Sequence, residues 1–208
     1  MTRMITLVED KAQKEGKHLA KNRYWSENGV EVFRAPLPVG DYVLMNDKIK
    51  DVIDRKTARG VDPKKMDFLG TYNVCCDSKF AVSELVADVC GPQHARFRDE
   101  CVLAQNNGIK LYILVENDPE VVYDKHGMYV ANKTITSLKD LHSWVNPRLW
   151  IFYHGKQKYP KATKGLTLQK VCYTLQRKYG VEFVFCSSKD AGAKILEILL
   201  REKSHSMQ

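Results

Sequence analysis

The chain has 208 residues, of which 44% are hydrophobic, so it can fill the core of one domain and is not mainly disordered. No apolar run approaches the roughly 20 residues needed to cross a bilayer, and the short run at 5–8 leads directly into Glu9 and Asp10. We therefore expect no membrane segment, no signal peptide and a cytoplasmic location. The six cysteines include no CxxC pair, so neither a disulfide framework nor a zinc site is predicted.

The net charge of +8 favours a polyanionic partner. The segment between Asp140 and Glu182 has no acidic residue, and its basic residues are Arg148, Lys156, Lys158, Lys161, Lys164, Lys170, Arg177 and Lys178. This basic strip suits contact with the phosphates of nucleic acid, although a solvated face would give the same pattern. The aromatic residues within it are Trp144, Trp150, Phe152 and Tyr153, which fit either base stacking or a small accessory core.

In the first third of the chain, residues 5–8 are expected to form a buried strand. A helix is expected over 11–25, ending at Asn28-Gly29. Residues 30–35 and 40–44 have the pattern of a β-hairpin interrupted by prolines. Residues 48–70 contain a short apolar patch and are expected to form a basic loop.

The next third predicts a strand at 72–76 and helices at 80–89 and 94–107. The strand expected at 109–116 is continuously apolar from Leu111 to Val115, so both of its faces must be covered. Helices on the two sides of a sheet would cover them.

The final third predicts helices near 138–145 and at 166–179, a strand at 181–186 and a closing helix at 190–201. The fold class is therefore α/β, with one central mixed sheet flanked by helices. One domain is expected, with residues 118–165 as a long excursion from it.

Carboxylates and lysines at strand ends are the remaining chemical signal, since no GxGxxG, GxxxxGK[ST], GxSxG or HExxH motif is present. Asp41 follows Gly40 at the start of one expected strand, and Asp77 with Lys79 ends another. Residues i and i+2 of a strand point to the same side, so Asp77 and Lys79 would project together. Two carboxylates can hold Mg²⁺ while a lysine stabilises charge on a reacting phosphate, which suits phosphodiester hydrolysis.

The Asp-x-Lys pattern is weak by itself, because a surface salt bridge at a strand end also produces it. The chain contains a second copy, Asp54-Arg55-Lys56, which follows the apolar Val52-Ile53. The pattern alone leaves both pairs open as catalytic candidates.

Several motifs taken together resemble the XPF-type branch of the PD-(D/E)XK nucleases, especially its stand-alone bacterial and phage members. They are Leu37-Pro-Val-Gly-Asp-Tyr42, the Asp-x-Lys pair, Ala95-Arg-Phe-Arg-Asp-Glu100, Ile113-Leu-Val-Glu116 and the strand at 181–187 followed by Asp190-Ala-Gly. The resemblance covers nearly the whole chain. It implies a restriction-endonuclease-like domain over 1–208 that cuts branched, flap or single-strand-containing DNA, leaves 5′-phosphate ends and serves DNA repair or recombination.

The resemblance also implies a Mg²⁺ cofactor, with Mn²⁺ as a substitute, and a possible homodimer. Its metal ligands carry over to Asp41 and Asp77, with Lys79 as the catalytic lysine, while Asp54 and Lys56 remain the alternative pair. We prefer Asp77 because its motif ends at Lys79, seventeen residues before Arg96 in the motif that follows. Residues 48–70 would then be a basic insertion, and Asp67 would be a rival to Asp41.

Glu100 stands where the family usually has a glutamine facing the active site, and it is our fourth catalytic candidate. Arg96 takes the place of an arginine that approaches substrate phosphate. Both residues could instead form an i,i+4 ion pair. The expected DNA-binding residues are Arg96, Arg98, Lys156, Lys158, Lys161 and Lys164, while His94 reads as a helix cap or surface residue and Glu116 could support the ligands from behind.

The amino-terminal motif departs from the family pattern, because Asp10 matches but Ala12 and Gln13 replace an arginine and a glutamate. This departure motivates an alternative function as a non-catalytic DNA-binding or partner subunit on the same fold. A basic RNA-binding protein with structural carboxylates is a third hypothesis.

Overall fold

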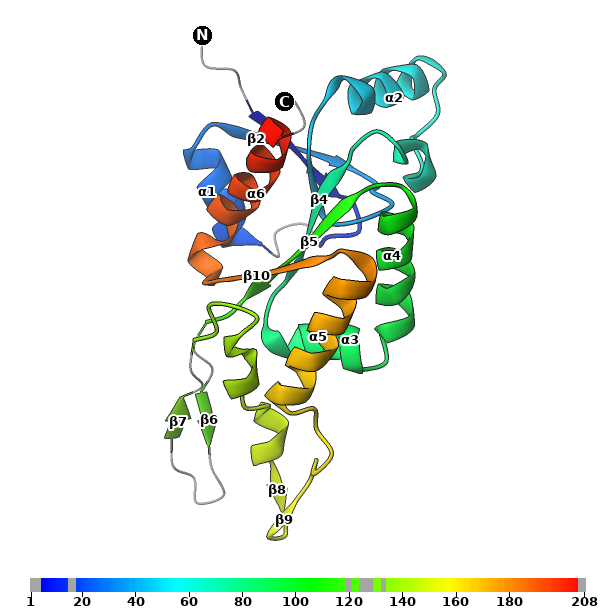
Figure 1. Ribbon diagram of the computed structural model, residues 1–208. Coiled ribbons are helices and arrows are strands. Elements are labelled where there is room, and N and C mark those ends of the chain that lie inside the picture. The colour runs from blue at the N-terminus through cyan, green and yellow to red at the C-terminus, as the bar shows by residue number, and fades with distance from the viewer. Residues whose placement is uncertain (1–4, 15–17, 119–120, 124–128, 132–133, 206–208) are drawn as a thin grey trace.

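The computed structural model describes residues 5–14, 18–118, 121–123, 129–131 and 134–205 (Figure 1). A six-stranded sheet, ordered β10-β5-β4-β3-β1-β2, forms its centre. Its strands are β1 (Ile5–Asp10), β2 (Val30–Ala35), β3 (Tyr42–Leu44), β4 (Val74–Lys79), β5 (Lys110–Glu116) and β10 (Glu182–Cys186). The sheet is mixed: β3 is antiparallel to β1 and β4, while the β1–β2, β4–β5 and β5–β10 pairs are parallel. The predicted α/β class with a mixed central sheet is confirmed.

Helices cover both faces of the sheet, as the apolar character of β5 requires. Leu111 and Ile113 of β5 face the cluster formed with α3 (Val82–Cys90), α4 (His94–Asn106) and α5 (Gly165–Tyr179). Tyr112 and Leu114 face the opposite cluster, which contains α1 (Leu19–Glu27) and α6 (Ala191–His205). The alternation of strand side chains therefore divides the core into two layers.

The predicted hairpin between 30–35 and 40–44 is wrong. β2 pairs only with β1, at the edge of the sheet, whereas β3 lies on the other side of β1. The connection between them passes the end of β1, where Leu37 and Val39 are buried and the Leu37 amide donates to Asp10 Oδ1 at 3.1 Å. Burial of this connection separates the two strands that a tight turn would have paired.

The segment at 48–70 is not a loop throughout, because α2 spans Asp47–Ala58 and a 3₁₀ turn, η1, spans Lys65–Phe68. Asn46 caps α2 by accepting a hydrogen bond from the Ile49 amide at 3.0 Å. Ile49 and Val52 are its buried residues, so a narrow apolar stripe packs this otherwise polar helix against the core.

Other predicted boundaries also change. α1 begins at Leu19, since residues 11–13 form a turn after β1, and residues 15–17 of the predicted helix lie outside the described part of the chain. The helix expected near 138–145 is only the 3₁₀ turn η2 (Asp140–Ser143). A Cβ at Gly165 would overlap the Trp144 carbonyl oxygen, so the start of α5 packs directly on this segment's backbone.

The excursion at 118–165 falls partly outside the described residues. Its described elements are β6 (Val121–Tyr123), β7 (Tyr129–Ala131), η2, η3 (Pro147–Trp150), β8 (Phe152–Tyr153) and β9 (Lys156–Gln157). A last turn, η4 (Ser188–Asp190), precedes α6. Within the described residues, no helix combines the length and apolar character needed to span a membrane.

Candidate active site

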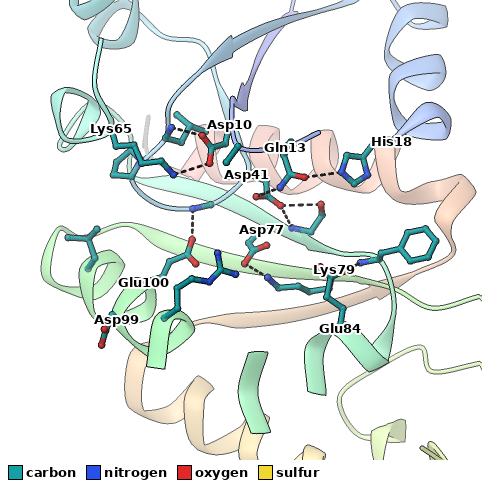
Figure 2. Close-up of a pocket in the computed structure, with 18 residues that line it drawn as sticks. Asp10, Gln13, His18, Asp41, Lys65, Asp77, Lys79, Glu84, Asp99 and Glu100 are labelled. Carbon is teal, nitrogen blue, oxygen red and sulfur yellow. Dashed lines mark hydrogen bonds and ion pairs between the residues drawn. The ribbon is translucent and has the colours of Figure 1, made fainter. Parts of the chain in front are cut away.

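A pocket of about 460 Å³ lies where the turn after β1, the Gly40-Asp41 bend, β4 and α4 meet (Figure 2). Asp41, Asp77, Lys79 and Glu100 all line it, and Arg96 stands at its rim with an exposed side chain. The structure thus brings together residues that are far apart in the sequence.

The Gly40-Asp41 bend requires glycine at its first position. Gly40 has a φ of +73°, and a Cβ there would lie 2.8 Å from the Cβ of Cys75. Its amide donates to Glu100 Oε1 at 2.9 Å, so the bend also orients that carboxylate. Backbone hydrogen bonds from the Asp41 amide to Cys76 O (2.9 Å) and from the Asp10 amide to Asp41 O (2.8 Å) fix Asp41 between two strands.

The Asp41 carboxylate accepts hydrogen bonds at both oxygens. Oδ2 receives the Ser78 amide at 2.9 Å and the Ser78 hydroxyl at 3.2 Å. Oδ1 receives the Gln13 side-chain amide at 2.5 Å, and Gln13 in turn contacts His18 at 2.9 Å. Burial raises the pKa of Asp41 in spite of these hydrogen bonds, so the pocket disfavours the charged form.

Asp77 and Lys79 project to the same side of β4, as their spacing predicts. The strand extends further than expected, to Lys79, so both residues lie within it and are buried. Lys79 Nζ lies 2.8 Å from Asp77 Oδ2 and 2.7 Å from Oδ2 of Asp88 on α3. Lys79 is therefore held between two buried carboxylates.

Burial and mutual repulsion perturb the carboxylates of this pocket. The pKa of Asp77 rises to about 7, chiefly through burial, with Asp41 adding to the rise against the opposing charge of Lys79. The pKa of Glu100 rises to about 6 through burial and the charge of Asp77. Burial alone would lower the pKa of Lys79, but Asp77 and Asp88 outweigh it and raise that pKa, so Lys79 stays protonated.

These donors suit a hard divalent cation. Mg²⁺ binds oxygen ligands and commonly takes one or two carboxylates, with water in its other positions. Within the described residues, no three His, Cys, Asp or Glu side chains are grouped closely enough to hold a metal ion by themselves. A magnesium ion in this pocket would therefore depend on one or two of Asp41, Asp77 and Glu100, together with water or substrate oxygens.

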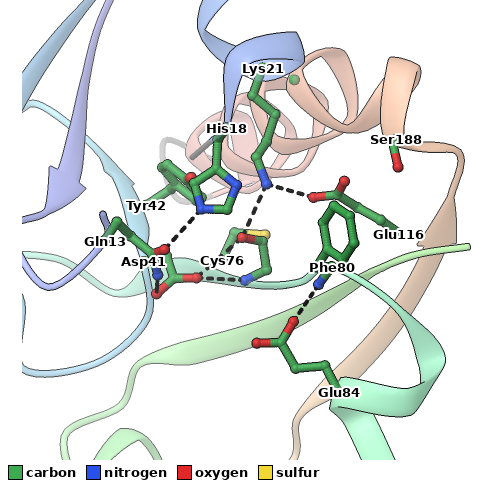
Figure 3. A network of polar contacts seen from close by, with 12 residues as sticks. Gln13, His18, Lys21, Asp41, Tyr42, Cys76, Phe80, Glu84, Glu116 and Ser188 are labelled. Atoms are coloured by element: carbon green, nitrogen blue, oxygen red, sulfur yellow. Dashed lines mark hydrogen bonds and ion pairs between the residues drawn. The ribbon is translucent and has the colours of Figure 1, made fainter. Parts of the chain in front are cut away.

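A second buried cation lies behind the pocket, on the opposite face of β4 (Figure 3). Lys21 of α1 is 2% exposed and pairs with Glu116 at 2.6 Å. Its ammonium group also donates to the Ser78 hydroxyl at 3.3 Å, and that hydroxyl reaches Asp41. A chain of contacts therefore links Glu116, at the end of β5, to Asp41.

The alternative residues lie elsewhere. Asp54 is exposed on α2, and Lys56 pairs with Asp67 at 2.9 Å beside η1, so none of the three lines the pocket. Arg98 is exposed and pairs with Asp99, while His94 is exposed at the start of α4. The predicted DNA-binding lysines, which lie outside the pocket, are Lys156, Lys158, Lys161 and Lys164.

Sequence reasoning missed Lys21, Ser78 and Asp88 as parts of this site. Asp88 carried a signal, because it follows Leu85 by three residues on the buried side of α3. Lys21 carried none, since it lies on a helix whose sequence has no clear apolar stripe to mark its buried side. Asp10, the residue that matches the family's amino-terminal motif, lines the pocket and pairs with Lys65 at 3.1 Å.

Comparison with known proteins places this geometry in a family, because the chain matches the ERCC4 domain over residues 9–199. The chain belongs to the ERCC4 domain family. This confirms the resemblance to XPF-type nucleases that the motifs indicated. No curated protein matches the chain in sequence.

Two solved structures share the fold of this ERCC4 domain. XPF from Aeropyrum pernix in complex with DNA matches with a TM-score of 0.50 and 13% identity, covering 96% of this chain and 66% of that one. XPF from Aeropyrum pernix, also with a TM-score of 0.50 and 13% identity, is matched over 95% of this chain and 65% of that one. The chain thus spans slightly less than two thirds of each relative.

Proposed function

We propose that this ERCC4 domain is a divalent-metal-dependent endonuclease that hydrolyses phosphodiester bonds in branched, flap or single-strand-containing DNA. Membership of the ERCC4 family supports a DNA nuclease. The observation that carries the proposal is the convergence of Asp41, Asp77, Glu100 and Lys79 in one pocket. The likeness to a fold seen bound to DNA in Aeropyrum pernix XPF is consistent with DNA as the substrate.

In this proposal Asp41 and Asp77 hold Mg²⁺, and Glu100 supplies a further carboxylate beside them. When bound, the ion would neutralise charge on the reacting phosphate and lower the pKa of a water molecule. The Gly40 amide, which donates to Glu100, keeps that side chain directed at the pocket. The Ser78 amide and hydroxyl orient Asp41 in the same way.

Lys79 contributes a fixed positive charge. Asp77 and Asp88 orient its ammonium group, and its raised pKa keeps it protonated at neutral pH. A protonated amine held in a buried site stabilises negative charge that develops on a phosphate oxygen. The guanidinium of Arg96 lies 4.0 Å from Asp88 Oδ1, yet its side chain is largely exposed at the rim, and in this proposal it contacts a neighbouring phosphate of the strand.

The test is cleavage of labelled flap, fork, single-stranded and duplex DNA with Mg²⁺, Mn²⁺ or EDTA. Asp77→Asn and Lys79→Met should each abolish metal-dependent cutting. Asp54→Asn and Lys56→Met are matched controls, since this second Asp-x-Lys copy lies outside the pocket. Loss of cutting in the control variants, or persistence in the Asp77 and Lys79 variants, would refute the assignment. The products should carry 5′-phosphates.

A non-catalytic DNA-binding or partner subunit is the second candidate, and one observation favours it. Gln13, which replaces an acidic residue of the family motif, donates to Asp41 and thereby occupies one of its oxygens. Salt-dependent DNA binding with no cleavage under any metal would support this role. Gln13→Glu should then restore metal affinity, measured by calorimetry with Mg²⁺ or Mn²⁺.

A further inference from the structure

A projecting arm, residues 146–164, leaves the body of the protein at the end away from α2 (Figure 1). Its tip is the β8–β9 hairpin, in which Phe152 pairs with Gln157 and Tyr153 with Lys156. The two turn residues, His154 (φ 47°) and Gly155 (φ +73°), both have positive φ, as a type I′ turn requires. His154 is the single non-glycine residue with positive φ in the described chain, so backbone strain is concentrated at this tip.

The arm has a defined base. Leu141 and Trp144 are buried in the core beside Leu168 of α5. Asn146 joins the two ends of the arm, because its oxygen accepts the Arg148 amide at 3.1 Å and its amide donates to Thr163 O at 3.0 Å. These contacts fix the position of the arm relative to α5 and the core.

The surface of the arm is basic and aromatic. Its cations are Arg148, Lys156, Lys158, Lys161 and Lys164, and within the described residues none of them pairs with a carboxylate. The exposed apolar side chains are Ile151 (43%), Phe152 (37%), Tyr153 (67%) and Tyr159 (37%). Such exposure costs solubility unless a partner covers the patch.

Cations and rings are interleaved on this surface. The Arg148 guanidinium lies 5.7 Å and the Lys158 ammonium 5.4 Å from the ring centre of Tyr159. These residues and Lys161 border an open pocket of about 380 Å³. At the tip, the rings of Tyr153 and His154 lie edge to face, 4.1 Å apart. Aromatic faces beside unpaired cations are the arrangement that stacks bases and binds phosphates of a single strand.

We propose that the arm is a binding site for single-stranded DNA, separate from the catalytic pocket. Stacking on Tyr153 and Tyr159 requires bases that are unpaired, which a duplex does not offer. This inference rests on the proposed nuclease function and deepens it, because it names the strand that the enzyme selects. A basic surface without exposed rings would have bound the phosphates of duplex and single strand alike.

The base of the arm meets the end of α3. The side chain of Thr163 in the arm lies beside that of Cys90 at the end of α3 and opposes the burial that raises the pKa of this thiol. The chain continues from Cys90 into α4, which bears Arg96 at the pocket. In this proposal a single strand held on the arm runs from the base of the arm toward α4.

The test is fluorescence anisotropy of the full chain with a labelled oligo-dT of about 15 nucleotides, in EDTA so that cleavage plays no part. Tyr153→Ala and Tyr159→Ala should each weaken binding about tenfold, since stacking of one base accounts for such a factor. Replacing Lys158 and Lys161 together by glutamine should lower the slope of log K against log salt by about 1.4.

Phe33→Ala on edge strand β2 is the matched aromatic control, since Phe33 is 38% exposed, and Lys189→Gln is the charge control. Both should leave oligo-dT affinity unchanged. Tyr153→Leu keeps an apolar side chain in the hairpin and should still lose affinity, which separates stacking from folding. Thermal melting verifies that each variant is folded.

If the tyrosine variants lose as much affinity for a blunt duplex as for oligo-dT, the proposal is overturned. Tighter binding of oligo-U than of oligo-dT by the wild type would overturn it too. Unchanged oligo-dT affinity in folded tyrosine variants would overturn it as well. Cleavage is measured separately with Mg²⁺. If the arm variants lose single-strand binding while the wild type cuts no DNA, the proposed binding site is supported and the proposed nuclease function is refuted.

Discussion

Replacing Asp77 with asparagine should stabilise the metal-free protein at about pH 8. Asp77 is 4% exposed, and burial raises its pKa from the ordinary 3.8 to about 7. The folded state therefore holds this proton more tightly than the unfolded state does. The stability linked to that proton is fully present below the unfolded pKa and is lost as the pH rises through the folded value.

The size of the effect follows from the same pKa values. A rise from 3.8 to about 7 corresponds to about 4 kcal/mol of free energy of unfolding. Asp77→Asn also removes one partner of Lys79, but Asp88 remains 2.7 Å from the ammonium group. We therefore expect a net gain of about 2 kcal/mol, or roughly 5 °C in Tm for a chain of this length.

The assay is thermal unfolding in EDTA across the range from about pH 5 to about pH 8, comparing wild type with Asp77→Asn. The difference in Tm between Asp77→Asn and the wild type should grow as the pH rises. Asp54→Asn, at an exposed position on α2, should have the same Tm as the wild type at every pH. Added Mg²⁺ should raise the Tm of the wild type most at the alkaline end and should have little effect on Asp77→Asn. A variant that is less stable than wild type at about pH 8 would show that Asp77 serves to pair Lys79.

Three further perturbations follow from the packing around β4. Gly40→Ala should lower the free energy of unfolding by about 3 kcal/mol, against about 1 kcal/mol for Gly108→Ala, which has a positive φ but open space; equal losses in urea denaturation would contradict the close approach to Cys75. Lys21→Met should lower the free energy of unfolding by about 3–5 kcal/mol, because Glu116 is left buried and unpaired. The Lys21→Met/Glu116→Gln double variant should recover most of this loss, and simple addition of the losses of the two single variants would argue against the pair. Asp88→Asn should slow cleavage about tenfold while the Kd for DNA in EDTA stays constant, because it orients Lys79; an unchanged rate would show that Asp77 alone fixes the lysine.

The fold was predicted correctly where the local pattern of apolar residues showed which faces of a strand are buried. The continuous apolar run in β5 demanded cover on both faces, and the structure supplies it with α1 and α6 on one side and α3, α4 and α5 on the other. The pairing of β2 could not be read in the same way. Alternation identifies a strand but not its neighbour, and the buried Leu37 connection carries β3 past β1.

The site was predictable to the extent that it depends on spacing within one element. The i,i+2 rule joined Asp77 to Lys79, but it could not separate them from Asp54 and Lys56, whose apolar neighbours imitate a strand end. The difference between the two copies is that Val52 belongs to the buried stripe of a helix. Gln13, Lys21 and Asp88 come from three other elements, and only the assembled sheet brings them to β4.

The two faces of β4 carry buried ion pairs that are related by its alternation. Asp77 and Lys79 point toward α3 and α4, where Asp88 completes their group, while Ser78 points toward α1 and meets Lys21. Burying a charge costs several kcal/mol, which a salt bridge offsets only in part, so hydrophobic residues would stabilise this sheet better. Asp41 connects the two groups, since its carboxylate contacts Ser78 from the pocket side. Charge is retained at the centre of the fold because it orients the groups that face the pocket, and variants that replace both partners of an ion pair with apolar residues should become more stable as they lose activity.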